Sequence, residues 1–310
     1  MKPNTHRFKI AVDCAEFSLE DKVGGQVYYD CGLIALPDSY TETGEPTRLI
    51  VNCHGAGGTV TTDDSQIEQQ MLTKYLLANV YAVMDVNGLP TEFAELKGID
   101  IRNNIGSPVA LQSYVKAYRY CMANFNLKKE VFVHGGSMGG ISSTNLVLSG
   151  YLPVIAQSGF CPVLDTYNQI FLNPWCGGLP KKALGEFYEL KKDENGEFIY
   201  DEAKISGYNP MGRLKTEGDK EYLDYPVPVK FWQCEDDTTV RIDSTKRFVA
   251  AIKNAGRDAH LRTFPAGGHE PQLYGNPIEN PSGIDIWRGE KIKITPAVEE
   301  AFLWIRSHDQ

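Results

Sequence analysis

The amino-acid sequence predicts an α/β fold, in which a mostly parallel, twisted sheet has helices on both faces. Short apolar runs, rich in β-branched or aromatic residues, recur along the chain and are typical of buried strands. Stretches with helical spacing separate these runs. Strand followed by helix, repeated, is the pattern of a parallel sheet whose crossovers cover its faces.

The alternation defines each expected element by its residues. Buried strands are expected at residues 48–53, 80–86, 131–135, 152–159, 227–234 and 260–265, and helices at 64–78, 108–125, 138–149, 243–255 and 296–307. The part before residue 47 predicts one or two antiparallel strands flanking the sheet. Residues 162–225 are charged and aromatic, contain turn signals and break the rhythm. We expect one domain, 1–310, with a cap or lid inserted at about 162–225; a solvated surface excursion is the alternative.

Composition and charge exclude several classes of function. The chain has 40 acidic and 31 basic side chains, a formal charge of -9, so its average surface repels nucleic acid and anionic lipid. No apolar run approaches the roughly 18 to 20 residues of a membrane helix, and the first residues lack the apolar centre of a secretory signal. We expect no nucleic-acid partner, no membrane association and a cytoplasmic location by default. Export after removal of a signal is the alternative.

The cysteines give no sign of a metal site. All seven are scattered along the chain, without a CxxC pair or a Cys/His cluster at the spacing of metal ligands. We therefore expect reduced cysteines in the core and no bound metal. A disulfide involving Cys161 and Cys176 is the alternative.

A glycine-rich turn at residues 135–139, GGSMG, predicts a nucleophilic serine. It fits G-x-S-x-G, follows an expected strand and precedes an expected helix. Ser137 at such a sharp turn has a strained backbone, and side chains at 135 and 139 would collide with neighbouring backbone. The N–H of Met138, at the start of the helix, is then able to bind an oxyanion. A glycine-rich turn with an ordinary serine is the alternative.

A second glycine-rich loop, HGAGG at residues 54–58, follows the first strong parallel strand. This is the place of the second oxyanion donor in hydrolases with a G-x-S-x-G turn, with Ala56 as first choice and Gly57 as second. We expect His54 to fix the loop rather than to act in catalysis. A dinucleotide fingerprint fits poorly, because Val60 stands where its third small residue is required, and no P-loop is present. We expect no cofactor.

A serine nucleophile needs a histidine to take its proton and an acid to orient the imidazole. Three carboxylates, Glu235, Asp236 and Asp237, follow one expected strand, and His269 lies in a glycine-rich loop after the next. The chain order serine, acid, histidine is the order of the hydrolases that carry the G-x-S-x-G turn. A turn histidine bonded to solvent is the alternative for His269.

Together these motifs resemble the α/β-hydrolase superfamily over roughly residues 30–307, and more closely its feruloyl and acetyl-xylan esterases and its prolyl-oligopeptidase-like catalytic domains. The resemblance implies Asp237 as the acid, because CEDDTTV aligns with G-x-x-D-x-x-V of these enzymes; Asp236 is the second choice. Cys234 stands where glycine is usual. The segment YNPMGRL, residues 208–214, is similar to the one that precedes this strand in such enzymes.

The resemblance implies acyl transfer to water through an acyl-enzyme, without metal or organic cofactor. We expect a small-molecule or carbohydrate-linked ester as substrate, of the acetyl or feruloyl type. Aromatic residues around the insertion, Phe160 and Trp175 foremost, are predicted to contact it, the alternative being that they form the core of a cap. A peptidase of the oligopeptidase type is a second hypothesis, disfavoured because no propeller-sized domain precedes the catalytic unit. A catalytically silent binding module is the third.

Overall fold

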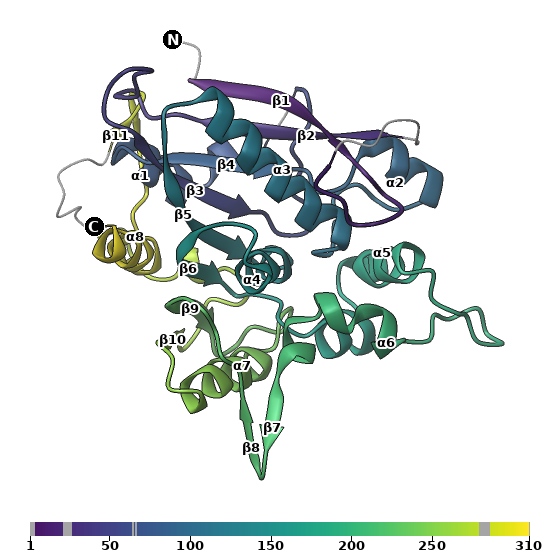
Figure 1. Cartoon of the computed structure of the whole chain (residues 1–310). Coiled ribbons are helices and arrows are strands. Elements are labelled where there is room, and N and C mark those ends of the chain that lie inside the picture. Colours follow the sequence, from purple (N-terminus) through teal and green to yellow (C-terminus); the bar gives the residue numbers. More distant parts are fainter. Residues whose placement is uncertain (1–3, 21–26, 64, 66, 279–285, 310) are drawn as a thin grey trace.

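The computed structural model describes residues 4–20, 27–63, 65, 67–278 and 286–309. Its centre is an eight-stranded sheet in the order β1-β2-β4-β3-β5-β6-β9-β10 (Figure 1). The strands are β1 Thr5–Val12, β2 Tyr28–Ala35, β3 Thr47–Cys53, β4 Ala82–Val86, β5 Leu127–Gly136, β6 Val154–Phe160, β9 Val229–Cys234 and β10 Ala259–Phe264. β1 and β2 are antiparallel, and the six strands from β4 to β10 run parallel. The predicted sheet and its flanking antiparallel strands are confirmed.

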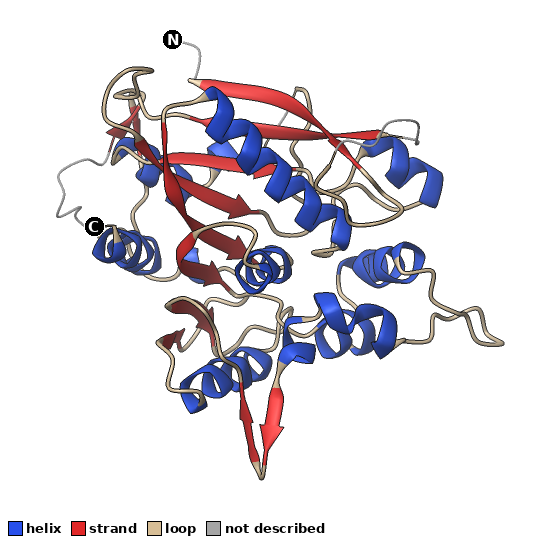
Figure 2. Ribbon diagram, in the orientation of Figure 1, coloured by secondary structure: helices blue, strands red, loops and turns tan. Residues whose placement is uncertain are grey.

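Helices lie on both faces of this sheet (Figure 2). They are α1 Met71–Ala78, α2 Thr91–Lys97, α3 Pro108–Asn124, α4 Gly139–Ser149, α7 Ile242–Asn254 and α8 Pro296–His308. Alternate strand residues point to opposite faces. Val131 and Val133 of β5 therefore pack in the cluster that contains α3 and α4, whereas Phe132 packs with α1 and α8. The strands are buried on both sides, which explains why their sequences are continuously apolar.

Two helices of the structure differ from what the sequence predicts. The helix expected at 64–78 begins only at Met71, after a 3-10 turn at Ile67–Gln69, and residues 64 and 66 lie outside the described residues. α2 was not expected, because its seven residues are too few for a clear helical period. It begins directly after Pro90 and ends before Gly98, whose φ of 63° is typical of a helix C-terminus.

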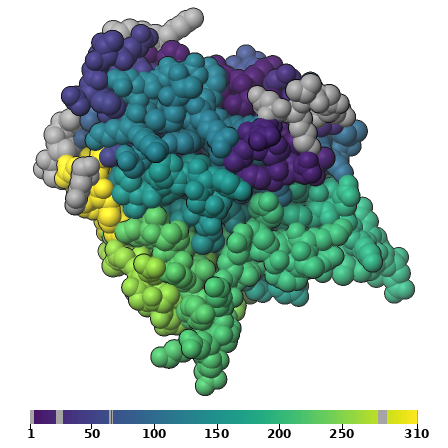
Figure 3. All heavy atoms as spheres, in the orientation of Figure 1, coloured from purple at the N-terminus to yellow at the C-terminus, as the bar shows by residue number. Residues whose placement is uncertain are grey.

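The chain between β6 and β9, adjacent strands of the sheet, contains the predicted insertion. It forms helices of several kinds, at Tyr167–Leu172, Cys176–Gly178, α5 Leu179–Phe187, α6 Glu202–Ile205, Ser206–Tyr208 and Pro210–Arg213, and the hairpin of β7 Lys215–Glu217 and β8 Lys220–Tyr222. The hairpin projects from the body of the molecule (Figure 3). A second short hairpin pairs β11 Ile286–Trp287 with β12 Glu290–Lys291. Among the described helices, none has the length and apolar character to span a membrane.

Candidate active site

The turn between β5 and α4 has the strained geometry that its sequence predicts. Ser137 has a φ of 50°, a left-handed conformation that is unusual for a residue with a side chain. A Cβ on Gly135 would lie 2.4 Å from the carbonyl oxygen of Gly139, and a Cβ on Gly139 would lie 1.9 Å from that of Cys53. Glycine is therefore required at both positions. The turn raises the serine side chain above the carboxyl ends of the strands.

His269 connects Ser137 to Asp237. Its Nε2 lies 2.8 Å from Ser137 Oγ, and its Nδ1 lies 3.0 and 3.2 Å from the two carboxylate oxygens of Asp237. The three residues follow three different strands, β5, β9 and β10. The side chain of Asp237 is fully buried and the imidazole is partly exposed. The geometry is that of a Ser-His-Asp triad, with the imidazole oriented from behind by a carboxylate.

The local hydrogen bonds distinguish Asp237 from its two neighbours. Asp237 Oδ1 accepts hydrogen bonds of 2.9 Å from the N–H groups of Thr239 and Val240, which fix the carboxylate in place. Asp236 instead accepts from the N–H of Gly268 at 2.8 Å, and so holds the loop that carries His269. Glu235 pairs with Lys246 on the surface. Of the three candidates, only Asp237 contacts the imidazole.

The loop after β3 passes directly against the serine, since a Cβ on Gly55 would lie 3.2 Å from the Cβ of Ser137. The N–H groups of Met138 and Ala56 donate to no other group in the described part of the chain. The N–H of Gly57, by contrast, donates to the carbonyl oxygen of Arg102 at 3.4 Å. Met138 and Ala56 are therefore free to bind an oxyanion, and the geometry argues against Gly57 as a donor.

His54 belongs to a buried polar network beneath this loop. Its Nδ1 lies 3.1 Å from Asp85, whose carboxylate also accepts from Tyr114 Oη at 2.8 Å and Asn52 Nδ2 at 2.7 Å. Burial disfavours the charged imidazole, but the charge and hydrogen bond of Asp85 outweigh it, so the pKa of His54 is raised. Among the described residues the imidazole of His54 bonds to Asp85 and Asn104, whereas Ser137 Oγ bonds to His269. It anchors the loop, as expected.

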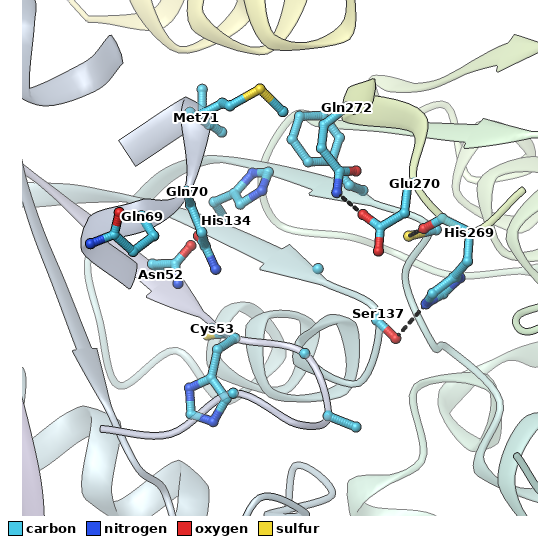
Figure 4. Close-up of a pocket in the computed structure, with 18 residues that line it drawn as sticks. Asn52, Cys53, Gln69, Gln70, Met71, His134, Ser137, His269, Glu270 and Gln272 are labelled. Carbon is cyan, nitrogen blue, oxygen red and sulfur yellow. Dashed lines mark hydrogen bonds between the residues drawn. The ribbon is translucent and has the colours of Figure 1, made fainter. Parts of the chain in front are cut away.

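A pocket of about 370 Å³ opens beside the triad (Figure 4). Its polar lining includes Asn52, Gln69, Gln70, His134, Glu270 and Gln272, and its apolar lining includes Met71, Leu72, Phe160 and Cys161. None of its described lining residues comes from 162–225. This pocket is bounded instead by the start of α1 and by the loop that follows His269, which favours the alternative that the aromatic residues of the insertion form the core of a cap.

The two predicted substrate-binding aromatics have different positions. Phe160, at the end of β6, lines the pocket and packs edge-on against the imidazole of His134. Trp175 does not line it. Its indole N–H donates to the carbonyl oxygen of Gln169 at 2.6 Å, and its ring packs on the apolar core. Trp175 is thus part of the insertion's own packing, which corrects its prediction as a substrate contact in this pocket.

Cys161 is the third potential metal ligand beside Asp237 and His269; one donor atom from each lies within 4.8 Å of the others. Both imidazole nitrogens already face Ser137 and Asp237, and the Cys161 thiol donates to the carbonyl oxygen of His269 at 3.1 Å. Burial raises the pKa of Cys161, which keeps it a thiol rather than a metal-binding thiolate. The donor set fits a triad better than a metal site.

The disulfide considered between Cys161 and Cys176 is not formed. Cys161 is buried, Cys176 is exposed and both are free cysteines, so the disulfide alternative is wrong.

Sequence reasoning did not find several polar residues of the pocket. His134 directly precedes the GGSMG turn, but nothing in the surrounding sequence indicates that this residue lines the pocket. Its Nδ1 lies 2.8 Å from Ser158 Oγ, and burial lowers its pKa to about 4, so the ring is neutral. Glu270 and Gln272 had a signal, their closeness to His269. Gln69 and Gln70 had none, because the segment before α1 reaches the pocket only through tertiary packing.

Comparison of the sequence with protein-family models and with curated proteins gives no match. Solved structures are similar. An acylaminoacyl peptidase of Pyrococcus horikoshii superposes with a TM-score of 0.61 at 13% identity, over 89% of this chain and 39% of the peptidase. A puromycin-hydrolyzing peptidase of Mycobacterium tuberculosis superposes with a TM-score of 0.58 at 16% identity, over 78% of this chain and 34% of that one. An esterase of the fungus Rhizomucor miehei superposes with a TM-score of 0.57 at 14% identity, over 98% of this chain and 84% of the esterase.

The chain has the α/β-hydrolase fold, which the sheet order and these structures show together. The chain spans 39% of the length of the Pyrococcus horikoshii peptidase. Identities this low show the fold and nothing finer.

Proposed function

We propose that this protein is a serine hydrolase that cleaves carboxylic esters through an acyl-enzyme. One observation carries the proposal: the imidazole of His269 joins Ser137 Oγ at 2.8 Å to the buried carboxylate of Asp237 at 3.0 Å. The nucleophile and the base thus line one pocket, and the orienting acid lies buried behind the base.

The geometry supports a sequence of proton transfers. Ser137 donates its proton to His269 Nε2 as Oγ attacks the ester carbonyl carbon, and Asp237 stabilises the imidazolium that forms. The carbonyl oxygen becomes an oxyanion within reach of the N–H groups of Met138 and Ala56. His269 then protonates the leaving alcohol oxygen, and the acyl group remains on Ser137. Water, activated by the same imidazole, releases the acid and restores the serine.

The substrate class we propose is an acyl ester of a carbohydrate or a similar hydroxyl-bearing alcohol. Three glutamine amides, Gln69, Gln70 and Gln272, line the pocket, and an amide offers both donors and acceptors to hydroxyl groups. Lysine and arginine are absent from the described lining, so an anionic substrate group would find no cation to pair with. The narrower resemblance to feruloyl and acetyl-xylan esterases stays a prediction.

Peptide hydrolysis is the second candidate. The observation that favours it is the fold: two of the similar solved structures are an acylaminoacyl peptidase and a puromycin-hydrolyzing peptidase. A catalytically silent binding module is the third, and the alignment of the triad argues against it.

A panel of substrates tests the proposal. Acetyl, feruloyl and longer-chain esters are compared with acylated amino-acid p-nitroanilides of matched size, with kcat/KM as the readout. We expect the esters to be cleaved with the higher kcat/KM relative to their uncatalysed hydrolysis. Cleavage of the anilides with equal or greater rate enhancement would favour the peptidase instead.

A further inference from the structure

A short segment that begins at the end of β6, residues 160–163, is bonded to both backbone polar groups of the nucleophile. The N–H of Ser137 donates to the carbonyl oxygen of Phe160 at 3.0 Å, and the N–H of Val163 donates to the carbonyl oxygen of Ser137 at 2.8 Å. The position of Ser137 is therefore set by this segment as well as by its own turn.

Cys161, the second residue of this segment, also reaches the loop of the general base. Its thiol donates to the carbonyl oxygen of His269 at 3.1 Å. Its N–H donates to the carbonyl oxygen of Trp232 in β9 at 2.8 Å, which fixes the backbone of Cys161 to the sheet. Burial raises the pKa of the thiol, and the nearby N–H of Ser137 opposes that rise. The sulfur thus lies beside the backbones of both Ser137 and His269.

The backbone of Cys161 is strained. Its φ of 41° lies in the left-handed region, which a residue with a side chain seldom adopts. Such a conformation persists only where the surrounding structure holds the residue in place, and residues of this kind cluster at functional sites. The conformation of Cys161 therefore indicates a role beyond filling the core.

The loop before His269 needs a restraint of this kind. Gly267 and Gly268 have φ values of 132° and 62°, and glycine allows the backbone more conformations than other residues do. Asp236 restrains one end of the loop, since it accepts a hydrogen bond of 2.8 Å from the N–H of Gly268. The bond from Cys161 acts at His269 itself, the residue whose imidazole must meet the serine.

We propose that Cys161 is a positioning residue for the reaction: its thiol holds the backbone of His269 against the segment that also holds Ser137. One segment then sets the places of both nucleophile and base, and keeps the imidazole aligned with the serine hydroxyl. Alignment matters because a displacement of about 1 Å can cost about 100-fold in rate. The inference rests on the proposed serine-hydrolase function, and it holds whether the bond that is cleaved belongs to an ester or to a peptide.

Three substitutions test the role of the thiol. Cys161→Ala removes the donor but keeps a Cβ, so the strain of the backbone is unchanged. Cys161→Ser keeps a donor on a shorter bond. Cys121→Ala is the matched control, because Cys121 is a buried cysteine of α3 whose thiol has no hydrogen-bond partner among the described residues and which does not line the pocket. Thermal melting verifies that each variant is folded.

The readouts are kcat and KM for p-nitrophenyl acetate and the rate at which a fluorophosphonate labels Ser137. Cys161→Ala should lower kcat and the labelling rate about three- to tenfold, the value of one neutral hydrogen bond, while KM stays within about twofold. Cys161→Ser should lie closer to the wild-type protein than Cys161→Ala does. Cys121→Ala should lower thermal stability without changing either rate.

A double-mutant cycle identifies the group through which the thiol acts. In a His269→Ala background the base is absent, so adding Cys161→Ala should leave the slow residual labelling of Ser137 unchanged. A further loss of the same size in that background would show that the thiol acts on Ser137 alone, and would overturn the inference.

The remaining outcomes are distinct. Unchanged kcat and labelling in folded Cys161→Ala, or an equal loss in Cys121→Ala, would overturn this inference and leave the serine-hydrolase proposal standing. A raised KM with unchanged kcat would also overturn it, because Cys161 would then act as a substrate contact. Wild-type protein that neither hydrolyses p-nitrophenyl acetate nor takes up the label would contradict the proposed function itself.

Discussion

The α-carbon of Gly139 lies so close to the backbone of Cys53 that a Cβ on it would stand 1.9 Å from the Cys53 carbonyl oxygen. The contact joins the start of α4 to the end of β3, and it brings the serine turn against the loop that holds Ala56. Gly139→Ala should therefore lower the free energy of unfolding by about 2 to 4 kcal/mol and reduce activity. Urea denaturation measures the first effect.

Gly136→Ala is the control for this substitution. A Cβ on Gly136 meets nothing within 4 Å, so the change in stability should stay within about 1 kcal/mol. Equal stabilities of the two variants would show that the close approach of Gly139 to Cys53 is not what requires glycine there.

Asp237→Asn should lower kcat by about 10⁴-fold, because an amide cannot stabilise the imidazolium and favours the wrong tautomer of His269. Asp236→Asn should have a much smaller effect, since the hydrogen bonds that Asp236 accepts among the described residues come from backbone N–H groups of the loop before His269. Steady-state hydrolysis of p-nitrophenyl acetate compares the two. A larger loss in the Asp236 variant would reassign the acid.

His54→Ala should lower kcat about tenfold or more with little change in KM, because the imidazole supports the loop that carries Ala56, whose N–H we propose as an oxyanion donor. The packing is close: a Cβ on Gly58 would lie 2.9 Å from His54 Cδ2. His260→Ala, at an exposed position, is the control. If KM rises while kcat holds, His54 acts on substrate binding rather than on the loop.

The pH dependence of stability should report His134. Burial lowers the pKa of His134 from its ordinary 6.5 to about 4. Between these two pH values, His134 is protonated in the unfolded chain but stays neutral in the folded protein. The free energy of unfolding should therefore fall as pH drops from 6.5 toward 4, by up to about 3 kcal/mol. His134→Gln should flatten this slope, even if it lowers stability overall. His260→Gln should leave the slope intact, and a slope unchanged in both variants would contradict the assignment.

The sheet was predictable because its strands are buried on both faces. Their sequences are therefore continuous apolar runs, separated by stretches with helical spacing. Ser137 was predictable for a different reason: the backbone of the serine turn tolerates only glycine at Gly135 and Gly139, and these leave a recognisable motif. His269 followed from its place in the chain, in a glycine-rich loop after the strand that follows the acid. Contacts that depend on how separate elements pack left no such trace.

The pocket shows this limit most clearly. Gln69 and Gln70 belong to the segment before α1, far in sequence from Ser137, and no local pattern marks their approach. Trp175 illustrates the opposite error. An aromatic residue in an insertion suits a ligand or a core equally well, and only the bond from its indole N–H to Gln169 shows that it serves the packing of the insertion.

The most direct test of the central claim is covalent labelling of the folded protein with a fluorophosphonate, followed by mass spectrometry of its peptides. The alignment of Ser137 with His269 predicts a single adduct on Ser137 in the wild-type protein and none in folded Ser137→Ala, together with loss of p-nitrophenyl acetate hydrolysis. Folded wild-type protein that takes up no label at Ser137, or a Ser137→Ala variant that retains turnover, would contradict it.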